Sequence, residues 1–148
     1  MRLPAPTALL LPLALAACAD DPAAPEEIVP SLLVSEVNEA GTSPEVNAEY
    51  DDARIHLDVT TWRNGCREAA GEDVDFDVGA RRVDVWVYDR ALPVVCFLEP
   101  DPKGRHITIL ALTRGTWTLV VHGARLSTTP GLDNPYVPFT VELEVTVP

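Results

Sequence analysis

The sequence predicts an all-β fold, an antiparallel β-sandwich of about seven strands. From Ala53 onward, apolar and polar residues alternate in short runs, which is the period-2 pattern of half-buried strands. Turn residues (Gly, Pro, Asn and Asp) separate the runs, and no stretch carries the apolar stripe of an amphipathic helix. Strands of this length and spacing are typical of two sheets that pack face to face about 10 Å apart.

The alternation places each strand and its inward face. In chain order, the predicted strands span residues 54–60, 73–78, 82–89, 94–98, 106–112, 116–123 and 139–147. A further short strand is predicted within residues 31–37. The predicted inward side chains are Ile55, Leu57, Val59, Val74, Phe76, Val78, Val83, Val85, Val87, Ile107, Ile109, Trp117, Leu119, Val121, Phe139, Val141, Leu143, Val145 and Val147.

The chain opens on an apolar segment that is too short to cross a bilayer, which needs about 20 apolar residues. Arg2 gives it a positive charge and small residues precede Cys18, so residues 1–17 are predicted to be a secretory signal peptide. The sequence Leu15-Ala16-Ala17-Cys18 resembles the lipobox of bacterial lipoproteins. The resemblance implies that the peptide is cut before Cys18 and that a lipid on Cys18 is the link to the membrane. Ala19, rather than Asp, follows Cys18, and for this reason the resemblance also implies attachment to the outer membrane.

An acidic, proline-rich segment follows the predicted anchor. Between residues 19 and 30 there are three prolines and four acids and no basic residue, a composition that favours an extended or disordered chain. We therefore expect residues 18–30 to be a tether and residues 31–148 to be the domain, with residues 31–52 disordered in part. Without residues 1–17, 131 of the 148 residues remain, an ordinary size for one domain.

The chain is strongly acidic, with 23 Asp+Glu against 11 Lys+Arg and a net charge of −12. Removal of residues 1–17 takes away Arg2 and no acid, which makes the net charge −13. Such a surface repels nucleic-acid phosphates and anionic headgroups, so nucleic acid is not an expected partner. Ten of the acids lie between Asp20 and Asp52, a block more typical of a solvated stalk than of a cation site.

Two cysteines remain after the predicted anchor, Cys66 and Cys96. Export would place them in an oxidising compartment, where such a pair is interpreted first as a disulfide. Closing a loop of roughly 30 residues would contribute about 3.6 kcal/mol in the chain-entropy treatment. A nucleophilic cysteine is the alternative, but it needs a base that lowers its pKa, and no His lies close in sequence to either residue.

One stretch resembles a family pattern. Residues 112–123, LTRGTWTLVVHG, resemble the L-x-P-G-x-Y-x-V-x-V-x-G strand of small immunoglobulin-like domains in bacterial lipoproteins. Such domains often carry a cysteine pair earlier in the chain, as Cys66 and Cys96 do here. The resemblance implies an immunoglobulin-like sandwich and export, but no particular activity. Trp117 stands in place of the usual Tyr, so the hydrogen bond of a tyrosine corner is not expected.

The sequence carries no catalytic signature. His56, His106 and His122 each lie on a predicted strand, are expected at the surface or at a sheet edge, and lack the spacing of zinc ligands. The motifs of serine hydrolases, P-loops and dinucleotide sites do not occur. Carboxylates are abundant, but any fold of so acidic a chain brings some together, so they do not indicate a glycosidase pair. We expect a protein that is not an enzyme and that has no cofactor, unless the calcium ion considered next is one.

An acidic strand raises the question of a metal. Asp75 and Asp77 share one face of the strand at residues 73–78, and Asp84 follows on the next strand. In either short hairpin register, one of the two stands opposite Asp84, and facing carboxylates are destabilising. Three arrangements would relieve this: an arginine of the pair at residues 81–82 between them, strands in different sheets, or a bound Ca²⁺. A weak calcium site of Asp75, Asp77 and Asp84 is therefore one hypothesis.

Trp86 and Tyr88 are the other candidate site residues. If the valines around them face the core, both rings point outward side by side, where they can stack on sugar rings or anchor a protein partner. The alternative is that a neighbouring strand, a loop or the N-terminal segment covers them.

These observations lead to one functional prediction with two alternatives. We expect an envelope protein, lipid-anchored to the membrane at Cys18, with a non-enzymatic binding, adhesion or structural role and an envelope protein or glycan as partner. The first alternative is a hydrolase of envelope polymers that uses paired carboxylates. The second is a protease inhibitor that presents a rigid loop at residues 99–104.

Overall fold

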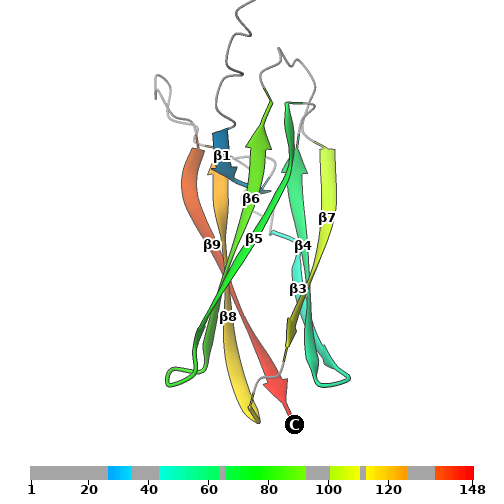
Figure 1. The fold of residues 1–148 in the computed structure, drawn as a ribbon, viewed down its shortest axis with the longest axis vertical. Helices are drawn as coiled ribbons and strands as arrows, with labels where there is room; N and C mark the ends of the chain where they lie inside the picture. Colours follow the sequence, from blue (N-terminus) through cyan, green and yellow to red (C-terminus); the bar gives the residue numbers. More distant parts are fainter. Residues whose placement is uncertain (1–26, 35–43, 64–65, 93–100, 111–112, 127–135) are drawn as a thin grey trace, which may run out of the picture.

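The computed structural model describes residues 27–34, 44–63, 66–92, 101–110, 113–126 and 136–148. These residues form nine strands and no helix (Figure 1), which confirms the all-β, sandwich-like fold. The count exceeds the predicted seven. The strands are β1 (Glu27–Pro30), β2 (Leu32–Val34), β3 (Val46–Asp51), β4 (Arg54–Arg63), β5 (Arg67–Asp77), β6 (Arg82–Ala91), β7 (Asp101–Leu110), β8 (Gly115–Leu126) and β9 (Tyr136–Val147).

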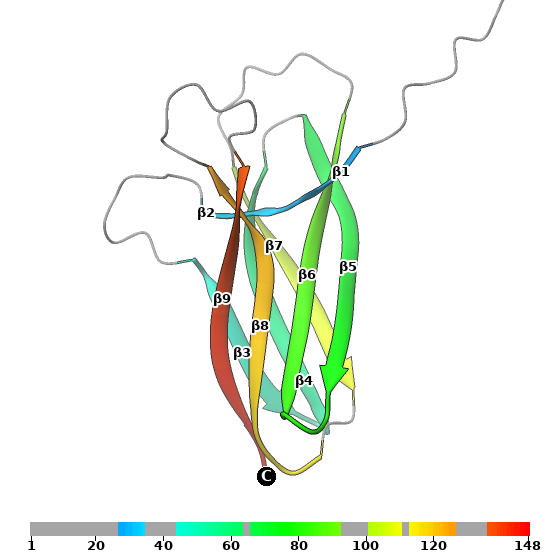
Figure 2. The ribbon, with the colours of Figure 1, turned by 90° about the vertical axis from the view of Figure 1, so that its left-hand side faces the viewer.

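Two layers face each other (Figure 2). One layer has the order β5-β6-β8-β9, and the other has the order β3-β4-β7. Strand β2 joins them, since it pairs with β8 of the first layer and with β4 of the second. The prediction of antiparallel pairing holds for most neighbours, but β6 and β8 run parallel, as do β2 and β8.

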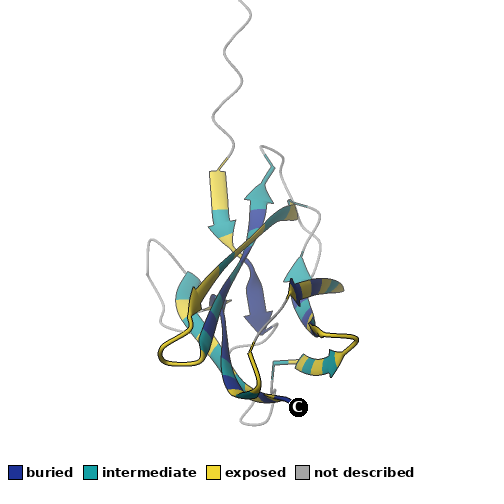
Figure 3. Ribbon diagram, turned by 60° about the horizontal axis from the view of Figure 1, so that its bottom comes forward, coloured by how far each residue is buried: buried dark blue, intermediate teal, exposed yellow. Residues whose placement is uncertain are grey.

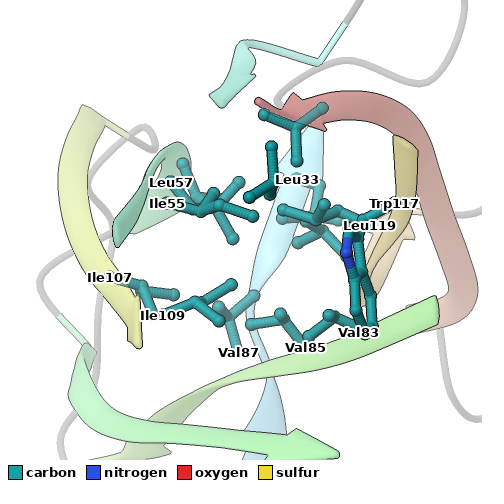
Figure 4. Packing of buried hydrophobic residues seen from close by; sticks show 14 residues of the cluster. Leu33, Ile55, Leu57, Val83, Val85, Val87, Ile107, Ile109, Trp117 and Leu119 are labelled. Carbon is teal, nitrogen blue, oxygen red and sulfur yellow. The ribbon is translucent and has the colours of Figure 1, made fainter. Parts of the chain in front are cut away.

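Alternation sets which side chains are buried, as predicted (Figure 3). The core cluster is made by Leu33, Ile55, Leu57, Val59, Val83, Val85, Val87, Ile107, Ile109, Trp117, Leu119, Val121, Val145 and Val147 (Figure 4). On the edge strands the prediction was partly wrong: Phe76 keeps 43% of its surface exposed, and Val78 keeps 63%. Both lie on or beyond β5, whose outer edge has no neighbouring strand among the described residues.

Trp117 is buried in the core and makes a side-chain-to-backbone hydrogen bond where a tyrosine corner was not expected. Its ring is 1% exposed, and its indole N–H donates to the carbonyl oxygen of Thr113 at 2.7 Å. Between the two residues, Gly115 has a φ of +125°, a conformation that residues with a side chain rarely adopt. The corner therefore keeps a side-chain-to-backbone hydrogen bond, made by an indole in place of a phenol.

The first strands cross between the layers at the end of the sandwich where β1 lies (Figure 2). Strand β1 pairs with the end of β6, while β8 pairs with its beginning, so β1 occupies the place beside β6 that β8 leaves. At the crossing, Ser31 donates its N–H to the carbonyl oxygen of Val87 and accepts from the N–H of Ala124. Gly123 makes room for this, because a Cβ there would lie 2.7 Å from the Ser31 carbonyl oxygen.

This crossing corrects the expected domain boundary. Residues 27–30 were predicted to belong to the tether, yet they form β1, and the buried Leu32 and Leu33 follow directly. Residues 46–51 also form a strand, so the disorder expected within residues 31–52 does not extend to them. Strand β1 was not predicted because it has only four residues, and β3 was not predicted because its alternating residues lie within the acidic stretch that was interpreted as solvated. Residues 1–26, with Cys18, and the strand predicted at 94–98 lie outside the described residues.

A buried ion pair fastens the two layers beside the crossing. The Asp89 side chain on β6 is fully buried, and Arg105 on β7 donates to it and to the Ser31 hydroxyl. The same guanidinium donates to the carbonyl oxygens of Tyr88 and Gly71. Burial raises the pKa of Asp89 above its ordinary value, and the charge of Arg105 opposes that rise.

Candidate binding face around Trp86

The outer side of the layer β5-β6-β8-β9 carries the aromatic residues singled out from the sequence. Strand register sets Asp73, Trp86, His122 and Thr140 in one row across the four strands. Tyr88 lies one outward position along β6, opposite Pro30 of β1. We call this surface the Trp86 face, made by Asp73, Trp86, Tyr88, His122 and Thr140.

Trp86 stacks on His122. Their ring centroids are 4.7 Å apart and their planes differ by 11°. The contact follows from the parallel pairing of β6 with β8, which sets the two residues directly side by side. Both side chains are half-buried, so the pair presents a ready-made aromatic surface to solvent.

Charged groups hold the stacked pair in place. A ring nitrogen of His122 lies 2.6 Å from a carboxylate oxygen of Asp84, and Arg82 donates two hydrogen bonds to the same carboxylate, both 2.7 Å long. The Arg82 hydrogen bonds, with a smaller contribution from His122, lower the pKa of Asp84 to about 2. Asp84 is therefore ionised over the physiological range and fixes the orientation of the His122 ring.

A shallow groove runs beside the stacked rings. It has a volume of about 170 Å³. Its lining is mainly apolar and aromatic, with polar groups at Tyr88, His122 and Thr140. Burial, together with the charge of the Asp73 carboxylate and the hydrogen bond that the Tyr88 hydroxyl donates to it, raises the pKa of Tyr88. The groove is lined by Pro30, Trp86, Val87, Tyr88, His122, Gly123, Pro138, Phe139 and Thr140.

The sequence left two arrangements open for Trp86 and Tyr88: an exposed ligand face, or rings covered by a neighbouring segment. Strand β1 pairs with β6 beside Tyr88, with Pro30 opposite it, so the N-terminal segment flanks this residue. Neither ring is fully buried, and both line the groove.

The calcium hypothesis does not fit the described residues. Asp75 stands opposite Asp84, as one of the two hairpin registers predicted, but Arg82 and His122 already occupy the Asp84 carboxylate. Asp77 accepts the backbone N–H of Ala80 instead of turning toward a shared centre. No three His, Cys, Asp or Glu side chains of the described segments form a group that could enclose a metal ion. An arginine relieves the facing carboxylates, the first of the three arrangements considered.

The opposite layer holds a contact that the sequence did not predict. On the outer side of β4 and β7, the rings of His56 and His106 stack with centroids 5.2 Å apart. The second ring nitrogen of His106 lies 2.8 Å from Asp58. We call this surface the His106 face, made by His56, Asp58 and His106. His106 lies 50 residues after His56 and 48 after Asp58, so only the register of β4 with β7 brings it to them.

The remaining predicted sites are placed as follows. Cys66 is disulfide-bonded, and its predicted partner Cys96 lies outside the described residues, so the pairing of these two stays a prediction. The inhibitor-loop reading is wrong for residues 101–104, which belong to β7 and pair with β4. For the hydrolase reading, Asp89 is the one fully buried carboxylate of the described residues, and it is bonded to Arg105.

Comparison with protein families, characterised proteins and solved structures finds no match for this chain. Among the described residues, no helix has the length and apolar character needed to span a membrane.

Proposed function

We propose that the chain is an exported, lipid-anchored envelope protein whose sandwich is a non-enzymatic binding module, with the Trp86 face as its binding surface. The stacked Trp86–His122 pair beside an open groove is the observation that carries this proposal. An aromatic ring held at the surface by a charged network is preorganised to receive a flat or ring-shaped ligand.

The chemistry of the face favours an uncharged envelope glycan. A sugar ring can stack its C–H face on the side of the indole that does not contact His122, and the groove, at about 170 Å³, is small for anything larger than one ring. At the groove, the Thr140 hydroxyl can donate or accept, and the Tyr88 hydroxyl, which donates to Asp73, can accept from a sugar hydroxyl. The carboxylates on this side of the sheet would repel a polyanion.

The position of the groove suits a short tether. Pro30, the last residue of β1, lines the groove, so the proposed site lies at the end of the sandwich where the chain arrives from its N-terminus. Eight residues separate Cys18 from Glu27, and an extended chain of that length spans about 25 Å. If Cys18 carries the lipid, the groove is held close to the membrane surface.

The binding proposal is tested by replacing the aromatic ring. We expect Trp86→Ala to reduce co-sedimentation with isolated envelope glycan by about tenfold or more, since stacked aromatic anchors dominate such contacts. Phe76→Ala is the matched control, because Phe76 is also exposed but belongs to the other side of β5. Equal retention of both variants, with both folded by circular dichroism, would refute the proposal.

The anchor is tested separately. We expect the mature protein to carry the mass of attached acyl chains and to partition with membranes, and Cys18→Ser to abolish both. A wild-type chain recovered with an unmodified Cys18 would contradict lipidation and leave the glycan result unaffected.

A further inference from the structure

The His106 face is built like one half of a transition-metal site. Nδ1 of His56 lies 3.2 Å from Nε2 of His106. Two imidazole nitrogens that bind one Zn²⁺ at about 2.0–2.1 Å would, at this separation, subtend an angle of about 100° at the metal, close to the tetrahedral value. Metal binding requires the two stacked rings to rotate so that both lone pairs point at a shared ion.

Asp58 completes the second layer of such a site. Its carboxylate lies 2.8 Å from Nδ1 of His106, so that nitrogen carries the proton and donates it, which leaves Nε2 as a bare lone pair. A carboxylate bonded to the distal nitrogen of a metal-binding histidine orients the ring and raises its basicity. His56 then donates its Nδ1 proton to His106, and by moving that proton to its own Nε2 it offers a second lone pair.

The surroundings leave coordination positions open. The side chains of Asp58 and His106 are 66% and 55% exposed. Water or an external ligand can therefore fill the remaining positions around an ion held by the two rings.

We propose that His56 and His106, oriented by Asp58, bind a divalent transition metal of the kind that prefers imidazole, Cu²⁺ or Zn²⁺. The site has two protein ligands, which is consistent with the lack of a three-ligand cluster among the described residues. It lies on the layer opposite the Trp86 face and does not depend on the proposed glycan binding.

The metal alone is the probe. We expect titration of the full chain, without a polyhistidine tag, with ZnCl₂ to show one site by calorimetry, and one equivalent of Cu²⁺ to give an electron paramagnetic resonance spectrum with nitrogen hyperfine structure. His56→Ala and His106→Ala should each weaken binding by about 100-fold, and Asp58→Asn by about tenfold, in line with the loss of a ligand and of its outer partner.

His122→Ala is the matched control, because His122 is the third histidine of the chain and is bonded to Asp84 on the other layer. It should bind Zn²⁺ and Cu²⁺ as the wild type does. His56→Gln provides a second variant that keeps a polar side chain on β4 if the alanine change disturbs folding. Equal binding by the wild type and the His56→Ala/His106→Ala double variant, or no binding by the wild type at millimolar metal, would overturn the proposal.

Discussion

The two outer faces of the sandwich each hold a histidine bonded to a carboxylate, yet their surroundings differ. On the Trp86 face, His122 bonds to Asp84, which also accepts two hydrogen bonds from Arg82, and its ring stacks on an indole. On the His106 face, Asp58 accepts from His106, and the partner ring is a second imidazole with a nitrogen of its own. The same dyad therefore supports an aromatic surface in one layer, and in the other it turns a ring nitrogen toward a second imidazole.

The neighbours of each carboxylate decide between these two uses. An arginine satisfies both oxygens of Asp84 and leaves the network closed. Asp58 orients a ring whose other nitrogen is turned toward His56. Whether an arginine neutralises the carboxylate, rather than whether a histidine contacts it, therefore distinguishes a structural His–Asp pair from a candidate metal-ligand pair.

The largest effect is expected where the two layers are joined. Asp89→Ala leaves the Arg105 charge buried without its partner, and we expect a loss of about 3–5 kcal/mol in the free energy of unfolding, measured with urea. Glu68→Ala removes the exposed partner of Arg90 and should cost less than about 1 kcal/mol. Similar unfolding midpoints for the two variants would show that the ion pair does not fasten the layers.

The next largest effect on stability is expected at Gly123 of β8, with Gly104 of β7 on the other layer as the comparison. Gly123→Ala would push a Cβ to 2.7 Å from the Leu33 side chain and the Ser31 carbonyl oxygen, so we expect a loss of about 1–3 kcal/mol and faster hydrogen exchange in β1 and β2. Gly104→Ala meets no atom within 4 Å and should change stability by less than about 0.5 kcal/mol. The account of the crossing fails if the two changes cost the same.

The next comparison is between Asp84 and Asp58, through the effect of replacing each carboxylate on the free energy of unfolding. We expect Asp84→Asn to lower the free energy of unfolding at pH 7 by about 1 kcal/mol, because charged hydrogen bonds are lost at a partly exposed site. Because the folded-state pKa of Asp84 is about 2 and its ordinary value is 3.8, this contribution is complete above about pH 4 and disappears as the pH falls toward 2. Asp58→Asn, at a more exposed site, should cost less. A deficit of Asp84→Asn that persists at pH 2 would contradict this assignment.

The smallest expected effect is a gain in stability, at the hairpin that joins β3 and β4. Ala53 has a φ of +61°, next to Asp52 at +45°, which is the two-residue turn that favours glycine. Ala53→Gly should raise the free energy of unfolding by about 0.5–1 kcal/mol without touching a side chain of the His106 face. A lower thermal midpoint for this variant would show that the turn relaxes to another conformation.

Much of the fold was predictable because alternation reports burial directly. The inward positions on β4, β6, β7 and β8 are buried as predicted, from Ile55 to Val121. Strand β1 was not predicted because it is short, and β3, which does alternate, was not predicted because it lies within an acidic stretch and is half-exposed. The burial of Phe76 was predicted wrongly, because its place in the alternation is inward but it lies on an edge strand with little to cover it.

The candidate sites were predictable only where one strand carries them. Trp86 and Tyr88 are two residues apart, so their common face follows from the period of a strand. The stacking of Trp86 on His122, and the contact between His56 and His106, depend on pairings across 36 and 50 residues. Register between distant strands is set by the whole core, and a single sequence does not reveal it.

The three histidines offer the most direct test of the two-face account, because each gives a separate ring-proton signal in an NMR spectrum. We predict that an uncharged envelope oligosaccharide shifts the signals of His122 and of the Trp86 indole and leaves those of His56 and His106 in place. ZnCl₂ should do the reverse. Oligosaccharide-induced shifts at His56 and His106, or none at His122 and Trp86, would contradict the claim that the Trp86 face is the binding surface.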